Sequence, residues 1–322
     1  MIPKVTEELH ECNVIDIRSR QRESFNDLIP EVEIPPEDYD MIKTLERNRS
    51  ERKGKESLPE ETFNEVLETC FKQGGYIGFR NALIFTLQAN WGVRCSDARI
   101  VKKIDFINEN GAFRESCLFS ELKTGKPRTM YINESIIMCV LMVIWSKDFK
   151  PLDYLLRGSN YKKVIDPRTG NVMRKDGHIV YELDWLGHKI PEPLSYPQIR
   201  KILSDKLVDD LGIQLKHHKN CEEGKFDYAT HSLRKLYSNK VEQLFQEMFG
   251  EQGKAHTAAM EFLNWDLNHS SLSTTSRYCG DFESVKKEIN MKMNLGYDVI
   301  KKYYEIEKEK YLRKRNHKMN IG

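Results

Sequence analysis

A strongly apolar run at residues 80–91, closed by Gly92, constrains the fold more than any other feature of the sequence. Such a run predicts a helix that is buried, and Gly92 suits the end of that helix. Residues 135–145 are apolar again and predict a second helix. With 39% hydrophobic residues in a chain of 322, there is enough apolar material to build a core around them.

Alternating apolar and polar residues at 117–132 predict a β-hairpin, because the alternation breaks at Lys123-Thr-Gly-Lys-Pro127 with Gly125 in the turn. Residues 158–190 are rich in Gly, Asp and Pro, which indicates turns joined by short strands. Helical spacing dominates the rest of the chain. We therefore predict a mainly α fold with a small antiparallel β-sheet, in the α+β class.

The domain boundary is expected near residue 56. Residues 1–56 form a mixed arm in which positions 23–40 carry seven acids and no Lys or Arg. Ser57-Leu-Pro-Glu60 matches a capping box, so a helix is predicted to begin there and to open a main domain at 57–282. Residues 283–322 are predicted to be a helical, basic tail.

Composition and the N-terminal sequence indicate the cellular compartment in which we expect the protein. The chain has no run of about 18 apolar residues, so no membrane helix is expected. Its N-terminus lacks the basic region and apolar stretch of a secretory signal. Seven cysteines are scattered without a CxxC pair, which indicates free thiols in a reducing compartment. We therefore expect a cytoplasmic protein.

The net charge of +2 does not by itself indicate a nucleic-acid partner. Basic residues are concentrated locally, with six bases against two acids at 43–55 and eight against three at 301–318. Such stretches can contact phosphates while the total stays near neutral, or they can be solvated helix faces. Charge alone leaves both interpretations open.

Five short features carry the residue types of phosphate chemistry and follow one another in one order. Taken singly, most of them are common patterns with ordinary structural explanations. They are Gly92-Val-Arg94-Cys-Ser-Asp97, Lys123 on the hairpin, His231-Ser-Leu-Arg234 at the start of a helical stretch, His269-Ser-Ser-Leu-Ser-Thr-Thr, and Tyr278 nine residues after His269. Their joint occurrence in this order points to a single site.

In these motifs the sequence resembles the tyrosine recombinase family, the phage-type integrases and their resolvase relatives, over about residues 57–282. The resemblance implies a site-specific DNA recombinase or integrase, a strand-transferase that works through a covalent 3′-phosphotyrosine without ATP, metal or another cofactor. It implies double-stranded DNA at a specific site as the partner, a homo-tetramer on paired DNA sites, and no membrane partner. It also implies an association with the nucleoid, or a virus or mobile element as the source.

The resemblance further implies a role for each matching residue. Arg94 and Arg234 are its two phosphate-clamping arginines, Lys123 its hairpin lysine, His231 and His269 its two histidines, Tyr278 its nucleophile, and Asp97 a supporting acid near the first arginine.

These residue types also suit the chemistry of a phosphodiester. Two arginines can bind the non-bridging oxygens of an anion whose transition state is more negative still. A phenol with a pKa of roughly 10 is neutral at pH 7 and needs a base, which a histidine can supply. A protonated lysine can give the leaving 5′ hydroxyl its proton. Lys123 is the predicted acid, with Lys126 and Arg128 as its rivals on the hairpin.

Departures from the family's pattern keep alternatives open. Only about 56 residues precede the main domain, so they are an arm or a reduced core-binding region. Arg234 and His269 are 35 residues apart, which is longer than usual, and the 44 residues after Tyr278 can dock on a neighbouring protomer or pack on their own domain. The cations within 158–190 contact phosphates or belong to a solvated loop. The alternative functions are a type IB topoisomerase or hairpin telomere resolvase with the same chemistry, and a non-catalytic DNA-binding protein.

Overall fold

The helix predicted from the apolar run is α3 (Gly75–Trp91), in which every residue from Asn81 to Trp91 is buried. The computed structural model describes residues 55–267, apart from 185, 217, 222 and 251, and residues 282–319. The second apolar helix, α6 (Glu134–Ser146), lies antiparallel to α3. Thr86 Oγ1 is 3.6 Å from Cys139 Sγ midway along the pair, and Asn133 Nδ2 donates to Asn90 Oδ1 (3.1 Å) at one end. Both predicted helices therefore form the centre of the core.

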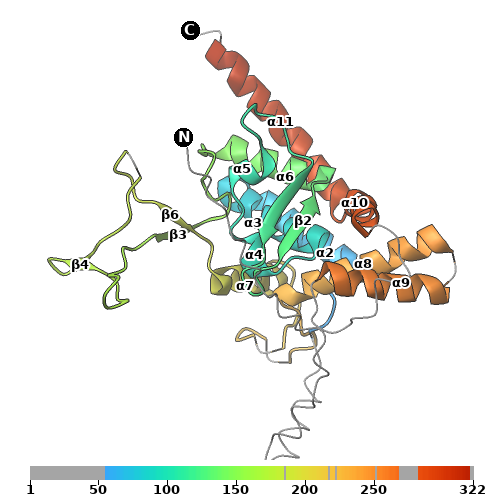
Figure 1. Cartoon of the computed structure of the whole chain (residues 1–322). Helices are drawn as coiled ribbons and strands as arrows, with labels where there is room; N and C mark the ends of the chain where they lie inside the picture. The colour runs from blue at the N-terminus through green and yellow to red at the C-terminus, as the bar shows by residue number, and fades with distance from the viewer. Residues whose placement is uncertain are drawn as a thin grey trace, which may run out of the picture. The chain divides into compact units, whose positions relative to one another are not determined.

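Further helices surround this pair (Figure 1). α2 (Glu60–Gln73) and α8 (Thr230–Phe249) pack against α3, and α9 (Gln252–Asp266) packs against α8. The remaining helical elements are α4 (Cys95–Ala98), α5 (Lys103–Phe106), α7 (Tyr196–Asp205), a π-helical turn at Lys206–Asp210, α10 (Phe282–Lys292) and α11 (Tyr297–Met319). None of the helices in the described part of the chain combines the length and the apolar character needed to span a bilayer.

The strands form three separate antiparallel pairs in the described residues. They are β1 (Ser116–Ser120) with β2 (Pro127–Tyr131), β3 (Arg157–Tyr161) with β6 (Pro191–Pro193), and β4 (Arg174–Lys175) with β5 (His178–Ile179). The first pair is the predicted hairpin, with Leu118 opposite Thr129 and Gly125 at φ 68° in the turn. The mainly α, α+β prediction is confirmed, although the β content is divided among pairs rather than gathered in one small sheet.

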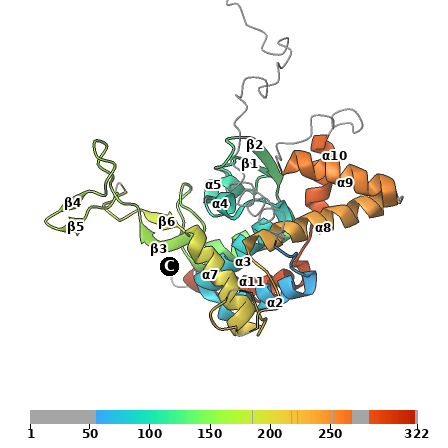
Figure 2. The ribbon, with the colours of Figure 1, turned by 90° about the horizontal axis from the view of Figure 1, so that it is seen from below.

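The other two pairs build a β-extension, residues 157–193, that projects away from the helices in both views (Figures 1 and 2). Its base is held by Tyr76, whose hydroxyl accepts a hydrogen bond from Arg157 N (2.8 Å), and by Leu194 N, which donates to Leu156 O (2.8 Å). Most of its side chains are exposed. Its strands pair with each other and not with the hairpin, and apolar side chains such as Ile165 and Leu183 are left 50% and 56% exposed on it.

The predicted capping box at Ser57–Glu60 is wrong. α2 begins at Glu60 with Pro59 as its N-cap, and no side chain caps it. Ser57 Oγ instead accepts from Asn239 Nδ2 of α8 (3.1 Å), and Leu58 is buried with its amide donating to Ser232 O (3.4 Å). Packing of this stretch against α8 therefore outweighs the local cap.

The C-terminal tail packs on its own chain through the first part of α11. The Tyr303 ring stacks on Phe71 of α2 at 5.0 Å, and the Tyr311 ring stacks on Trp145 of α6 at 4.9 Å. Residues 312–317 are exposed. Docking of the tail on a neighbouring protomer stays a prediction, as do the boundary near 56 and the structure of the arm, because residues 1–54 lie outside the described residues.

Candidate active site

Gly92 turns the chain out of α3 and places Arg94 at the end of that helix. Its φ of 59° lies in the left-handed region that favours glycine. A Cβ at this position would stand 2.3 Å from Cδ1 of Tyr237, a fully buried ring of α8. Two independent constraints thus require glycine here, and the next residues, Val93 and Arg94, lead directly into α4.

Arg94 is held by a buried carboxylate from the hairpin. Its Nη1 lies 2.7 Å from Glu121 Oε2, which also accepts from Thr124 Oγ1 at 2.7 Å. The other oxygen of Glu121 is 3.3 Å from Nη1 of Arg128. Burial opposes ionisation of Glu121, but the Thr124 and Arg94 hydrogen bonds and the charge of Arg128 outweigh it and lower its pKa. Glu121 therefore stays ionised between two arginines.

Asp97 ties α4 to the hairpin turn rather than to Arg94. Its Oδ1 accepts from the amide of Leu122 at 3.0 Å, and its side chain is buried. Lys123, the next residue after Leu122, is exposed at the tip of the hairpin. The supporting acid thus positions the backbone that carries the predicted general acid.

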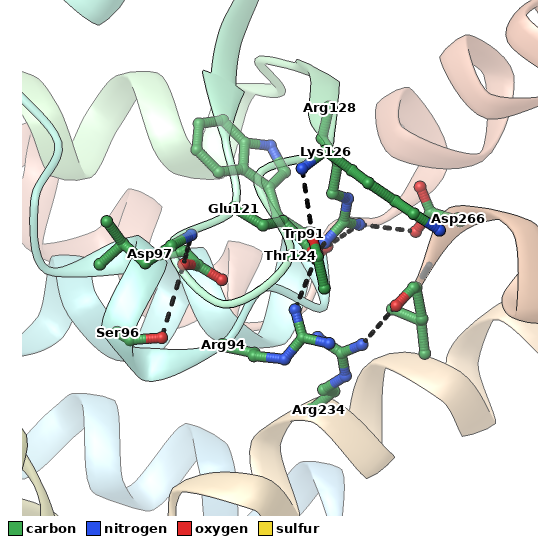
Figure 3. Close-up of polar contacts among 12 residues, drawn as sticks. Trp91, Arg94, Ser96, Asp97, Glu121, Thr124, Lys126, Arg128, Arg234 and Asp266 are labelled. Carbon is green, nitrogen blue, oxygen red and sulfur yellow. Dashed lines mark hydrogen bonds and ion pairs between the residues drawn. The ribbon is translucent and has the colours of Figure 1, made fainter. Parts of the chain in front are cut away.

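His231 and Arg234 lie one turn apart near the start of α8, as the motif predicts. Arg234 Nη2 donates to the carbonyl of Leu267 (3.1 Å), while its Nη1 is buried without a hydrogen-bond partner among the described residues. Burial, with the like charges of Arg128 and Arg94, lowers the pKa of Arg234 to about 10. Figure 3 shows the guanidinium groups of Arg94 and Arg234 next to each other beside the hairpin.

His231 belongs to the same electrostatic environment. Its pKa is lowered by partial burial and then by the charges of Arg234, Arg94 and Lys123. Four of the predicted site residues, from α8, the α3–α4 turn and the hairpin, are therefore close enough to influence one another.

The sequence analysis missed the buried ions that support these residues. Arg128 Nη2 lies 3.0 Å from Asp266 Oδ2, the oxygen that also accepts from the Tyr237 hydroxyl at 2.9 Å. Asp266 Oδ1 lies 2.8 Å from Lys286 Nζ of α10. The charges of Arg128 and Lys286 outweigh the burial of Asp266 and lower its pKa. We call Arg94, Arg128 and Arg234 the arginine cluster.

The two hairpin residues that rival Lys123 as the predicted general acid, Lys126 and Arg128, differ in their burial. The side chain of Arg128 is 2% exposed and is enclosed by Glu121 and Asp266, whose charges raise its pKa although burial opposes them. Arg128 is therefore unavailable to protonate a leaving group, and its predicted rivalry is wrong. Lys126 is exposed on the same turn as Lys123, so it remains a rival.

Two of the predicted residues, His269 and Tyr278, lie outside the described residues. Described residues on either side of 268–281 contact the arginine cluster or its carboxylate partner. Leu267 accepts the hydrogen bond from Arg234, and Lys286 pairs with Asp266. The sequence places His269 two residues after Leu267 and Tyr278 eight residues before Lys286.

No family model matches this chain, and no curated protein matches it. Among solved structures, it is similar to the XerH site-specific recombinase bound to palindromic difH substrate in a post-cleavage complex. That match has 18% identity and a TM-score of 0.39, and it covers 73% of this chain and 51% of the other. It is also similar to the Tn1549 transposon integrase in complex with circular intermediate DNA, with 16% identity, a TM-score of 0.34, and coverage of 74% and 66%. The chain thus spans about half the length of the XerH chain that it matches.

Proposed function

We propose that this protein is a tyrosine recombinase that cleaves and rejoins DNA strands at specific sites through a covalent 3′-phosphotyrosine. The observation that carries the proposal is Nη1 of Arg234, a buried donor without a partner in the described part of the chain. A buried donor without an acceptor is costly, so this atom suits an accepting ligand. With Arg94 and Arg128 close by, that ligand is an anion, and a phosphodiester matches the fork of an arginine.

The carboxylates of the site leave a cationic surplus. Glu121 lies between Arg94 and Arg128, and Asp266 lies between Arg128 and Lys286. With Arg234 added, this network has four cations and two carboxylates, and including the exposed Lys123 and the buried Asp97 leaves the same surplus of two. Donors that are already in place, and need no rearrangement, are most effective where negative charge grows, as it does on a pentavalent phosphorane.

His231 is suited to take the phenolic proton of Tyr278. Because its pKa lies below the usual value of 6.5, its ring is neutral at pH 7 before DNA binds. As the phenol oxygen attacks phosphorus, its proton passes to the imidazole, which becomes a cation beside the developing negative charge. His269 is the second histidine proposed to contact the same phosphate.

Lys123 is the proposed acid for the leaving group. It stands exposed on a turn whose backbone is fixed by Asp97, so it can follow the 5′ oxygen of bound DNA. The bond from phosphorus to the 5′ oxygen breaks, and that oxygen takes the proton of Lys123. Attack by a 5′ hydroxyl reverses the sequence and releases Tyr278. The bond energy stays in the phosphotyrosine, so rejoining needs no ATP.

Chain connectivity supports a role for Tyr278 at this site. Eight residues of extended chain span at most about 28 Å, so Lys286 tethers this tyrosine to the cluster. The proposed partner is double-stranded DNA at a specific site, bound as a homo-tetramer on paired sites. The proposed location is the cytoplasm, in association with the nucleoid, or with a virus or mobile element as the source of the protein.

The direct test is covalent capture. The protein is incubated with nicked suicide DNA, drawn from sequences selected for binding, and run on a denaturing gel. A DNA adduct is expected, and Tyr278→Phe should abolish it without weakening DNA binding. Tyr196→Phe, at a tyrosine that is 43% exposed on α7, is the matched control and should form the adduct normally.

Three outcomes would contradict the proposal. An adduct that persists in Tyr278→Phe would assign the nucleophile elsewhere, and the absence of any adduct on selected sites would favour a DNA-binding protein without catalysis. Relaxation of supercoiled plasmid without site preference would instead identify a type IB topoisomerase.

A further inference from the structure

Asp266 occupies an unusual place, at the last residue of α9 and immediately before the segment that carries His269 and Tyr278. Its side chain is 0% exposed and has three polar neighbours. They are Arg128 Nη2 at 3.0 Å, the Tyr237 hydroxyl at 2.9 Å and Lys286 Nζ at 2.8 Å. An isolated buried carboxylate is costly, whereas this one is held by two cations and a hydroxyl.

The partner Lys286 lies on the other side of the same segment. Positions 266 and 286 flank residues 268–281, so a single ion pair joins the two ends of the chain that bears the proposed nucleophile. The Lys286 side chain is 3% exposed, and its ammonium lies 5.2 Å from the centre of the Trp265 ring. Neither member of the pair can exchange its partner for water.

The same carboxylate also reaches the phosphate-binding arginines. Arg128 connects Asp266 to Glu121, and Glu121 holds Arg94, through contacts of 3.0, 3.3 and 2.7 Å. A continuous chain of ion pairs therefore runs from Lys286 to Arg94, and all of its members are buried except Arg94, whose side chain is 22% exposed. Because protein interiors are close-packed, this chain of contacts can transmit a displacement of Asp266 or Lys286 to Arg94.

We infer that Asp266 and Lys286 are positioning residues that hold α9 and α10, on the two sides of the proposed nucleophile, beside the arginine cluster. This inference rests on the proposed function. The pair touches no reacting atom and acts through the described residues on either side of 268–281, by keeping the end of α9 and the start of α10 together next to Arg128. Reactions that depend on near-attack geometry lose about 100-fold in rate from a misplacement of about 1 Å.

α10 has a second anchor, which allows the pair to be cut without detaching the helix. Asn290 Oδ1 accepts from the amide of Tyr131 on β2 (3.2 Å), and the carbonyl of Asn290 accepts from Asn133 Nδ2 (3.2 Å). Lys286→Met keeps an unbranched side chain of similar length and removes the charge together with the hydrogen bond to Asp266. The matched control is Lys292→Met on the same helix, where an exposed lysine pairs with Glu288 at 2.7 Å.

The first measurement is the single-turnover rate of adduct formation at saturating nicked DNA, with the dissociation constant and melting temperature measured in parallel. Lys286→Met and Asp266→Asn should lower the rate about 10- to 100-fold. Their DNA dissociation constants should stay within about threefold of wild type. Lys286→Arg should recover part of the rate, and Lys292→Met should match wild type. A rate that is unchanged, or one that falls only in step with DNA binding and melting temperature, would overturn the inference.

The second measurement does not require activity. Hydrogen–deuterium exchange of the full chain should show faster exchange of amides at the end of α9 and in the first turns of α10 in Lys286→Met, with α3 and α6 unchanged. Unaltered exchange at both of these helix ends would overturn the positioning role even if wild type forms adducts. Absence of an adduct from wild type, together with altered exchange, would overturn the proposed reaction while leaving the structural coupling in place.

Discussion

The arginine cluster and the β-extension are both rich in cations, and they use them differently. In the extension, Lys162 and Glu182 lie 3.8 Å apart with side chains 38% and 47% exposed. In the cluster, Arg128 and Asp266 lie 3.0 Å apart with side chains 2% and 0% exposed. Water satisfies the first pair at little cost, whereas only protein or ligand atoms can satisfy the second. Burial, rather than the number of basic residues, therefore marks the candidate phosphate site.

The largest effect is expected from Arg234→Met. Loss of one preorganised donor to the transition state should lower the rate of adduct formation by about two to three orders of magnitude. The melting temperature should hold steady or rise, because the substitution removes a buried charge that Arg94 and Arg128 repel. Single-turnover cleavage and thermal unfolding measure the two effects. Arg174→Met in the β-extension is the control. An equal loss of rate in that variant would contradict the proposed difference between the arginine cluster and the β-extension.

Glu121→Gln should cause the next largest effect, on stability. It leaves Arg94 and Arg128 without the carboxylate that lies between them, and breaking a buried ion pair on one side costs about 3 kcal/mol. Urea denaturation measures the change in the free energy of unfolding. A loss below about 1 kcal/mol would show that water reaches these arginines as it reaches the extension.

Lowering the pH should reduce the difference in unfolding free energy between wild type and Glu121→Gln. The folded-state pKa of Glu121 lies below its usual value of 4.5, so its stabilisation is fully present above about pH 4.5. That stabilisation is lost as the pH falls from 4.5 through the lowered folded-state pKa. The gap in unfolding free energy between wild type and Glu121→Gln should therefore narrow between pH 6 and pH 3 in denaturation series. A gap that is constant over this range would contradict an ionised Glu121.

The smallest effect is expected from Glu182→Gln in the β-extension. Its exposed pair with Lys162 contributes little, so the free energy of unfolding should change by less than about 0.5 kcal/mol. The same urea series measures it beside Glu121→Gln. A loss comparable to that of Glu121→Gln would mean that exposure does not separate the two regions.

Periodicity predicted the elements well where one physical signal dominated. The apolar run at 80–91 became α3, and the alternation at 117–132 became the hairpin with Gly125 in its turn. The capping box at Ser57 failed because Asn239, 182 residues away, binds that hydroxyl. A local pattern holds no information on so distant a partner.

The candidate site also divides into residues that sequence motifs identify and residues that only tertiary contacts identify. Arg94, Lys123, His231 and Arg234 were predicted from motifs, since their side-chain chemistry and order can be read in the sequence. Glu121, Asp266 and Lys286 were missed because a buried charged residue looks like any surface one until its partners are known. Their positions give one weak signal, since Glu121 and Asp266 lie two and three residues before motif residues.

The sequence alone determined which side chains can bind a phosphate and which stretches must be buried, because residue chemistry and apolar periodicity are local properties. Only the tertiary structure decided which cations are neutralised and which remain to meet a ligand. That outcome depends on residues far apart in the chain, such as Arg128 and Asp266, which share a desolvated contact 138 positions apart. The free energy of a charge is set by what surrounds it, and the fold alone determines the surroundings.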